Sequence, residues 1–276
     1  MKRICVLLIT LFFVSCAEPM PETPNGGITF KLAQPMGQKS VYSLKSNGEV
    51  SLGSSEGETL QSAKVLMDAT LNMEVTSAQP DGQWSLTGQF ADVVLTFNGQ
   101  SQPEMAGKMS DQKFTVTYDK DGKVVNIVGL EQVEGGIDMK QMASQMNPGN
   151  IFPKQPVNVG DSWPVEFTES SQLEGDTITE TTKGTGTLKE VSNGQATLEY
   201  DLDKQMAASP SRGPNVGMNG GGKVKTTMTF DLEKSRITSS RSDLKVEATM
   251  QMRMGARTET THSVFTNQMN LELVNK

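Results

Sequence analysis

The chain is poor in the residues from which most hydrolytic and metal-dependent active sites are built. It has one histidine, His262, and two cysteines, Cys5 and Cys16. Histidine triads, zinc centres and proton shuttles therefore lack their usual bases and ligands. None of the phosphate-binding, dinucleotide-binding or nucleophile-elbow motifs of common enzyme classes occurs. We expect a protein that is not an enzyme and that needs no cofactor. His262 is expected on the polar face of its strand.

Aromatic residues and long apolar runs are also scarce. Aromatic residues make up 5% of the chain, with two Trp and three Tyr. A transmembrane β-barrel carries aromatic girdles at both membrane interfaces, and so few aromatic residues do not supply them. No run approaches the roughly 20 apolar residues of a transmembrane helix. A net charge of −7 argues against nucleic acid and against electrostatic adhesion to anionic lipid.

The start of the chain has the pattern of a targeting signal. Two basic residues precede the apolar segment Ile4–Val14, which has the length of a signal-peptide core. The sequence that follows, Phe13-Val14-Ser15-Cys16, resembles the lipobox of bacterial lipoproteins. The resemblance implies that the signal peptide, residues 1–15, is removed and that Cys16 carries a diacylglycerol thioether. The alternative is an ordinary signal peptide with an incidental cysteine.

The residues after Cys16 predict where the anchored protein goes. In the sorting systems that the lipobox resemblance implies, an Asp after the cysteine retains a lipoprotein in the inner membrane. Ala17 stands there instead, which implies the outer membrane of a Gram-negative bacterium. Residues 16–27 contain three prolines and no apolar pattern, so they predict a flexible tether. The expected partner is the membrane, through the lipid on Cys16.

Alternation of apolar and polar residues dominates the rest of the chain. From Val65 to Val75 every odd position is apolar, which predicts a strand with one face on a core. A turn signal follows at residues 79–82. The apolar phase changes near Asp92, where we expect a bulge. The same pattern predicts strands near 114–118, 196–202, 224–230, 244–254 and 265–273. Strands separated by turn signals indicate antiparallel pairing.

Several segments recur along the chain. "DGQWSL" at 81–86 is similar to "NGQATL" at 193–198, and "TYDKDGKVV" at 117–125 is similar to "TFDLEKSRI" at 229–237, both at an offset of 112 residues. A weaker match aligns Gly37 with Gly160. We therefore predict one duplicated domain over residues 28–276, with copies near 28–130 and 154–276. The expected fold is all-β with one short helix: an internally duplicated antiparallel sheet, curved into a half-barrel or barrel-like shape.

Three segments outside the strands carry separate predictions. Apolar residues at helical spacing predict the short helix, at residues 137–146. The segments 98–112 and 209–223 occupy equivalent places in the two copies, and their Gly, Ser and Gln content predicts mobile loops. The "YDKDG" stretch at 118–122 predicts a hairpin turn, with the start of a calcium loop as the less favoured interpretation.

Methionine is abundant, with 17 residues. Met250, Met252 and Met254 share one strand face, and thioethers in this pattern can bind Cu(I). Packing is the favoured interpretation, because these positions continue the apolar phase of Leu244 and Val246. We therefore predict no metal site and keep copper binding as an alternative.

The "NVGDSW" stretch at 158–163 and the "YDKDGKV" turn at 118–124 resemble an uncharacterised lipoprotein family of Gram-negative bacteria, a domain of unknown function. That resemblance implies no catalytic residues. The predicted architecture is similar to half-barrel lipoproteins that carry lipid or lipoprotein cargo. We expect non-catalytic binding of an apolar ligand or an envelope component. Copper binding, or a structural or protein-interaction role in the envelope, are the alternatives.

Overall fold

The structure is a computed structural model that describes residues 27–30, 32, 34–54, 59–129, 148–173, 176–209, 216–254 and 257–274. These residues form one twelve-stranded sheet and two short helices. The strands are β1 (Lys39–Ser54), β2 (Thr59–Ala78), β3 (Trp84–Phe97), β4 (Gln100–Ser101), β5 (Lys113–Tyr118), β6 (Val124–Val128), β7 (Ser162–Leu173), β8 (Asp176–Ser192), β9 (Gln195–Ser209), β10 (Val216–Asp231), β11 (Arg236–Met254) and β12 (Arg257–Leu273); the helices are α1 (Pro103–Asp111) and α3 (Pro148–Ile151).

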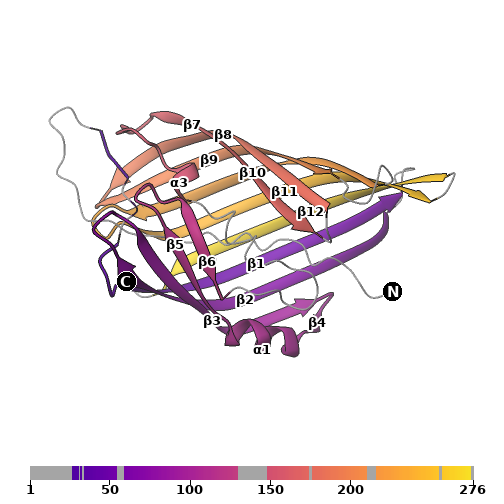
Figure 1. Ribbon diagram of the computed structural model, residues 1–276, viewed down its shortest axis with the longest axis horizontal. Helices are drawn as coiled ribbons and strands as arrows, with labels where there is room; N and C mark the ends of the chain where they lie inside the picture. The colour runs from indigo at the N-terminus through magenta and orange to yellow at the C-terminus, as the bar shows by residue number, and fades with distance from the viewer. Residues whose placement is uncertain are drawn as a thin grey trace.

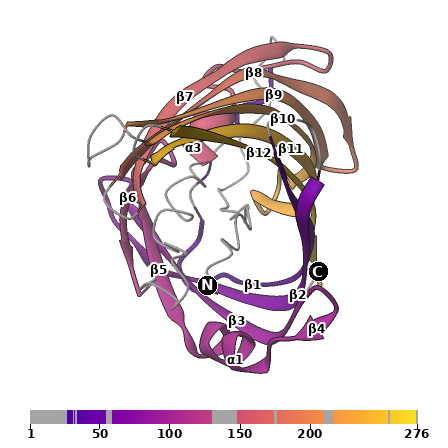
Figure 2. The same cartoon turned by 90° about the vertical axis from the view of Figure 1, so that its right-hand side faces the viewer.

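The strands pair in the order β6-β5-β3-β2-β1-β12-β11-β10-β9-β8-β7, with β4 attached to β3. Most strands that follow one another along the chain are also neighbours in the sheet, and the pairing with the longest sequence separation joins the first strand to the last. β1 pairs with β12 from Tyr42 opposite Leu273 to Ser54 opposite Thr261. This pairing joins two antiparallel meanders in the middle of the sheet (Figure 1). The predicted all-β antiparallel class is confirmed, and the sheet is curved but not closed (Figure 2).

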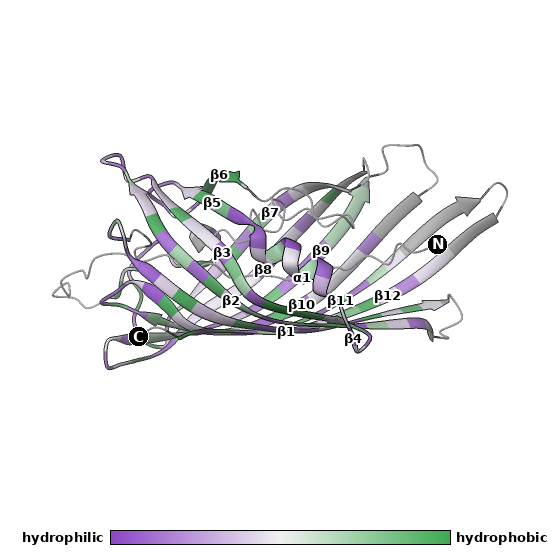
Figure 3. Ribbon diagram, turned by 90° about the horizontal axis from the view of Figure 1, so that it is seen from below, coloured by the Kyte–Doolittle hydropathy of each residue, from purple (hydrophilic) through white to green (hydrophobic). Residues whose placement is uncertain are grey.

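The two faces of the sheet differ as the alternation predicts. Side chains that share the phase of Leu44, Leu71 and Leu198 are buried on the concave face. The convex face carries lysines directly opposite acidic residues on neighbouring strands, such as Lys45 opposite Asp68 with Nζ and Oδ2 3.2 Å apart. Opposed charges of this kind favour the observed register. Hydrophilic and hydrophobic residues therefore alternate along the strands (Figure 3).

The predicted bulge at Asp92 is confirmed. Asp68 pairs with Val94 and Thr70 with Ala91, so two residues of β3 face one residue of β2. Asp92 has a φ of 52°, as a bulge residue often does. The Oγ1 of Thr70 donates to the Asp92 carboxylate at 3.4 Å. The bulge shifts the phase of β3, which keeps Phe90 and Leu95 on the same concave face.

One arrangement of hydrogen bonds occurs twice. The Gly37 N–H donates to the Val75 carbonyl at 2.8 Å, and the Gly160 N–H donates to the Leu188 carbonyl at 2.7 Å. Both glycines have a positive φ, and a register shift follows both Val75 and Leu188. The start of β1 is therefore attached to β2 in the same way as the start of β7 is attached to β8. This recurrence agrees with the predicted duplication, whose copy boundaries stay a prediction.

The prediction of equivalent loops at 98–112 and 209–223 is wrong. In the first, Asn98 and Gly99 form a tight turn into β4, and Pro103 starts α1. Ala106 and Met109 are the buried face of this helix, which packs on β3 beyond the part of β3 that pairs with β5. In the second, β10 already begins at Val216. Two apolar residues are enough to pack α1 on the sheet, and the segment 216–223 belongs to a strand through its backbone pairing with β9 and β11.

Several predictions concern residues outside the described part of the chain. They are the signal peptide at 1–15, Cys16 with the tether up to residue 26, and the short helix at 137–146. The hairpin turn at 118–122 is confirmed: the Gly122 N–H donates to the Asp119 carbonyl at 3.0 Å, and the Asp119 carboxylate accepts two more backbone N–H groups.

Candidate functional site: the concave face of the sheet

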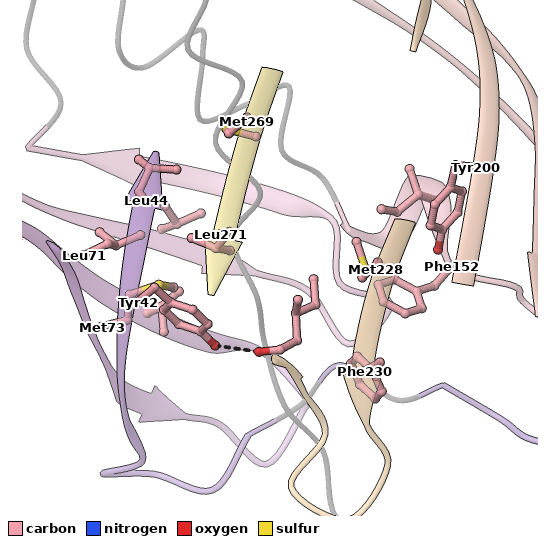
Figure 4. Close-up of a cluster of buried hydrophobic side chains, with 14 of the residues drawn as sticks. Tyr42, Leu44, Leu71, Met73, Phe152, Tyr200, Met228, Phe230, Met269 and Leu271 are labelled. Atoms are coloured by element: carbon pink, nitrogen blue, oxygen red, sulfur yellow. Dashed lines mark hydrogen bonds between the residues drawn. The ribbon is translucent and has the colours of Figure 1, made fainter. Parts of the chain in front are cut away.

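Large apolar side chains from both meanders meet on the concave face. They come from strands far apart in the sequence and are almost completely buried (Figure 4). The labelled cluster comprises Tyr42, Leu44, Leu71, Met73, Phe152, Tyr200, Met228, Phe230, Met269 and Leu271. Because the strands alternate, every second residue of each strand contributes to this face.

A plug covers this face at the end of the sheet where β1 starts. We use the name for α3, the following residue Phe152, and residues 27–30. The rings of Phe30, Phe152 and Phe230 pack against one another, with centroids 5.4 to 5.5 Å apart. Ile28 pairs with Val157 through two backbone hydrogen bonds.

The plug also connects the two free edges of the sheet. The Gly149 N–H donates to the Gly122 carbonyl in the β5–β6 turn at 3.1 Å. The Trp163 indole N–H, on β7, donates to the Ile151 carbonyl at 2.7 Å. β6 and β7 are the edge strands, so α3 bridges the gap between them at this end. The sheet remains open although its edges are tied together.

Polar side chains lie further along the concave face. The Ser46 hydroxyl donates to the Asn267 side-chain oxygen at 2.9 Å, across β1 and β12. Thr226 and Ser242 share a hydrogen bond of 2.8 Å across β10 and β11. All four residues are buried. The concave face therefore carries hydroxyl and amide groups among its apolar side chains.

A charged group lies on the same face beyond these hydroxyls. Glu169 on β7 is directly opposite Glu180 on β8, and the Lys204 ammonium on β9 lies 3.2 Å from a Glu180 carboxylate oxygen. The side chains of Lys204 and Glu180 are only 12% and 11% exposed, whereas every other described lysine that pairs with an acidic residue is at least 44% exposed.

The environment of this charged group changes its protonation. Burial raises the pKa of the Glu169 carboxyl to about 7; the Lys204 ammonium lowers it in part, and the Glu180 carboxylate raises it. A neighbouring carboxylate in a partly dry site favours the neutral form of a carboxyl group, here that of Glu169. The group can therefore exchange a proton near neutral pH and can hydrogen-bond a polar ligand atom.

Sequence reasoning missed this group, although a signal for it existed. Lys204 shares the phase of the apolar residues Leu202 and Met206, and a lysine at such a position is expected on the inner face. Glu180 lies on a strand made mainly of threonines and glycines, which has no clear apolar phase. The pairing of β7, β8 and β9 is needed to bring the three residues together.

The remaining predicted site residues are placed as follows. His262 is exposed on β12, and its Nδ1 lies 3.1 Å from the Thr249 hydroxyl, as expected for a residue on the polar face. The backbone of Met250, Met252 and Met254 belongs to β11, but their side chains are outside the described part, so packing against copper binding stays open. Within the described residues, no group of three or more His, Cys, Asp or Glu side chains could hold a metal ion.

A groove of about 500 Å³ lies on the convex face over β10, β11 and β12. Three lysines line it, but each lies within 4.0 Å of a carboxylate: Lys223 with Asp203, Lys225 with Asp201 and Lys245 with Glu247. Paired, exposed lysines of this kind are typical of a solvated sheet surface. In the described part of the chain, no helix is long and apolar enough to cross a membrane.

Comparison with protein families gives one match. Residues 134–237 match a family of unknown function, DUF6263. The matched part is less than half of the chain and includes α3, β7–β10 and the first residues of β11. The "NVGDSW" stretch lies inside it and the "YDKDGKV" turn outside it. No curated protein sequence matches the chain.

Two solved structures show how weak the structural likeness to other proteins is. An outer membrane channel from Pseudomonas putida F1 aligns with a TM-score of 0.21 and 8% identity, covering 92% of this chain and 100% of that one. OmpF of Salmonella typhi, in complex with daunomycin, aligns with a TM-score of 0.22 and 9% identity, covering 84% of this chain and 98% of that one. At these TM-scores neither match identifies a common fold or activity.

Proposed function

We propose that this chain is a lipid-anchored envelope protein that binds an apolar ligand, without catalysis, on the concave face of its open sheet. The observation that carries the proposal is the shape and chemistry of that face. The sheet is curved but not closed, and its inner face carries large apolar side chains with buried polar and charged groups among them. A face of this mixed character suits a molecule with an apolar part and a polar part.

The anchor is the second part of the proposal. The lipobox-like sequence ending at Cys16 supports lipidation, and residues 16–27 would connect the lipid to the sheet. Ala17 supports sorting to the outer membrane. The apolar ligand would then be bound next to the membrane that supplies or receives it.

Ligand binding can be tested with the fluorescent apolar probe N-phenyl-1-naphthylamine. The full-length chain carrying Cys16→Ala should give a saturable increase in probe fluorescence. Ala248 is half-buried on the concave face of β11, and Glu247 is exposed on the convex face. Ala248→Trp should therefore weaken probe binding, and Glu247→Trp should leave it unchanged. Equal effects of both variants, or no saturable signal, would contradict the proposal.

The anchor is tested in cells by metabolic labelling with palmitate. Cys16→Ala should abolish labelling and release the processed chain from the membrane fraction. Ala17→Asp should keep labelling and move the protein to the inner membrane fraction. Labelling that persists in Cys16→Ala would exclude Cys16 as the lipidated residue.

A further inference from the structure

One buried cation in the sheet has no counterion in the described part of the chain. Arg236, the first residue of β11, is 6% exposed. Its Nη1 donates to the Ser40 hydroxyl at a long 3.5 Å, and its Nε has no partner. Among the described residues, the Arg236 side chain has no other hydrogen-bond acceptor.

The acidic residue best placed to neutralise Arg236 has another role. Asp231 is directly opposite Arg236 in the β10–β11 pair. Its Oδ1 accepts the backbone N–H groups of Glu233 and Lys234, at 3.0 and 2.9 Å, and so holds the β10–β11 turn. The register alone therefore does not supply Arg236 with a counterion.

Two other cations of this chain provide a contrast. Lys204 is almost as buried, and it has Glu180 at 3.2 Å. Arg241, on the same strand as Arg236, is 62% exposed and lies 3.7 Å from Asp243. An unpaired cation away from water is strongly unfavourable. A guanidinium buried as Arg236 is therefore expected to have an anionic partner that comes from outside the described chain.

The surroundings of Arg236 indicate what kind of partner fits. Ser40 is buried at the start of β1, opposite Met73, and shares the concave phase of Tyr42. A planar guanidinium binds carboxylate and phosphate oxygens in a bidentate manner, and serine hydroxyls add donors. Beside these polar atoms the face is apolar.

We propose that Arg236, with Ser40, binds the anionic head group of an amphiphile, a carboxylate or a phosphate, whose hydrocarbon chain lies along the concave face. The inference rests on the proposed function, because it names the chemical class of the apolar ligand. In this arrangement Arg236 and the Ser40 hydroxyl bind the anion, and the apolar side chains of the concave face contact the hydrocarbon.

The test uses three ligands of equal chain length: hexadecanoate, hexadecyl phosphate and hexadecanol. Each is titrated at pH 9 against the probe-loaded, full-length chain carrying Cys16→Ala. The two anions should displace the probe at least about tenfold more tightly than the alcohol, a difference of about 1.4 kcal/mol. Arg236→Gln should abolish this preference and leave hexadecanol displacement unchanged. Arg241→Gln, the exposed control, should keep the preference.

The melting temperature of the ligand-free variants separates a ligand arginine from a structural one. Removing an unpaired buried cation should leave the melting temperature of Arg236→Gln unchanged or raised. A clear decrease would mean that the chain itself supplies the counterion, which overturns the inference.

The other outcomes are equally distinct. Displacement by hexadecanol as tight as by the anions would overturn the inference and leave the proposed function standing. No displacement by any of the three from a chain that binds the probe would overturn the inference only, whereas the absence of saturable probe binding would overturn the proposed function. A preference between the carboxylate and the phosphate would identify which head group the site takes.

Discussion

Trp163 lies directly opposite Gly186 in the β7–β8 pair, and its indole ring covers that glycine. A Cβ built on Gly186 would come within 2.5 to 2.7 Å of three ring atoms of Trp163. The same arrangement joins Phe114 and Gly88 across β3 and β5. Each ring fills the space left by a missing side chain, as at strand positions where another group approaches the backbone closely.

Gly186→Ala should therefore destabilise the protein, because the Trp163 ring would have to leave a packed position. We expect a loss of about 2 kcal/mol in the free energy of unfolding. Gly107→Ala is the matched control: Gly107 is exposed in α1, and its added Cβ would meet nothing within 4 Å. That change should stabilise by about 0.5 kcal/mol. Denaturant unfolding of both variants checks the prediction, and a stable Gly186→Ala would contradict it.

Two buried tyrosines on the concave face should respond in opposite ways to loss of their hydroxyl. The Tyr42 hydroxyl donates to the Ile237 carbonyl at 3.2 Å, across β12. The Tyr200 hydroxyl is buried without a partner, and burial raises its pKa. Tyr42→Phe should cost about 1 kcal/mol, whereas Tyr200→Phe should be neutral or stabilising. Thermal unfolding of the ligand-free variants measures both stability changes. If Tyr200→Phe lowers the stability more than Tyr42→Phe does, the Tyr200 hydroxyl has a hydrogen-bond partner.

The strand map was predictable because each strand has one face on the core. Val65 to Val75, the turn after it and the bulge at Asp92 all follow from the period of two. Alternation shows which face of a strand is buried, but it does not show which strand lies beside it. The β1–β12 pairing, which joins the two meanders, leaves no local mark in the sequence.

The functional candidates were less predictable for the same reason. Glu169, Glu180 and Lys204 come together only through the pairing of three strands. Arg236 is an ordinary arginine after a turn until its burial and the use of Asp231 in that turn are known. In α1, Ala106 and Met109 are too few to produce a strong helical signal, although Pro103 and the Glu104–Lys108 pair are typical of a helix start and a helix face.

The charged group predicts a specific dependence of stability on pH. The pKa of Glu169 is about 7 in the folded chain against an ordinary value of 4.5. Between these values the folded state binds more protons than the unfolded state, so wild-type stability falls as pH rises. Glu169→Gln removes the titrating carboxyl and with it this decrease in stability. The variant should gain about 1 to 2 kcal/mol over wild type between pH 5 and pH 8, after allowance for the partial exposure of Glu169.

Melting temperatures at both pH values measure this gain, which should amount to a few degrees. Glu166→Gln is the control, since Glu166 lies on the same strand with a 64% exposed side chain that pairs with Lys183. The difference in melting temperature between Glu166→Gln and wild type should be the same at pH 5 and pH 8. A Glu169→Gln difference that is constant from pH 5 to pH 8 would mean that Glu169 is ionised normally.

Lys204 should be far more important for stability than any lysine of the convex face. Lys204→Met leaves the carboxylates of Glu169 and Glu180 facing each other without a cation, and we expect a loss of about 3 kcal/mol at pH 8. The loss should be smaller at pH 5, where Glu169 is protonated. Lys45→Met is the control, because Lys45 and Asp68 are 64% and 55% exposed; it should cost less than about 1 kcal/mol.

A double variant tests whether the stability lost in Lys204→Met is due to the unpaired carboxylates or to lost packing. Replacing both Lys204 and Glu180 by Met removes the buried ion pair and keeps side chains of similar volume. Its free energy of unfolding should recover most of the loss, because two apolar groups need no counterion. Chemical denaturation at pH 5 and pH 8 measures all three variants. If the double variant is as unstable as Lys204→Met, the ammonium contributes through its packing, and the charged group has no special role in the stability of this face.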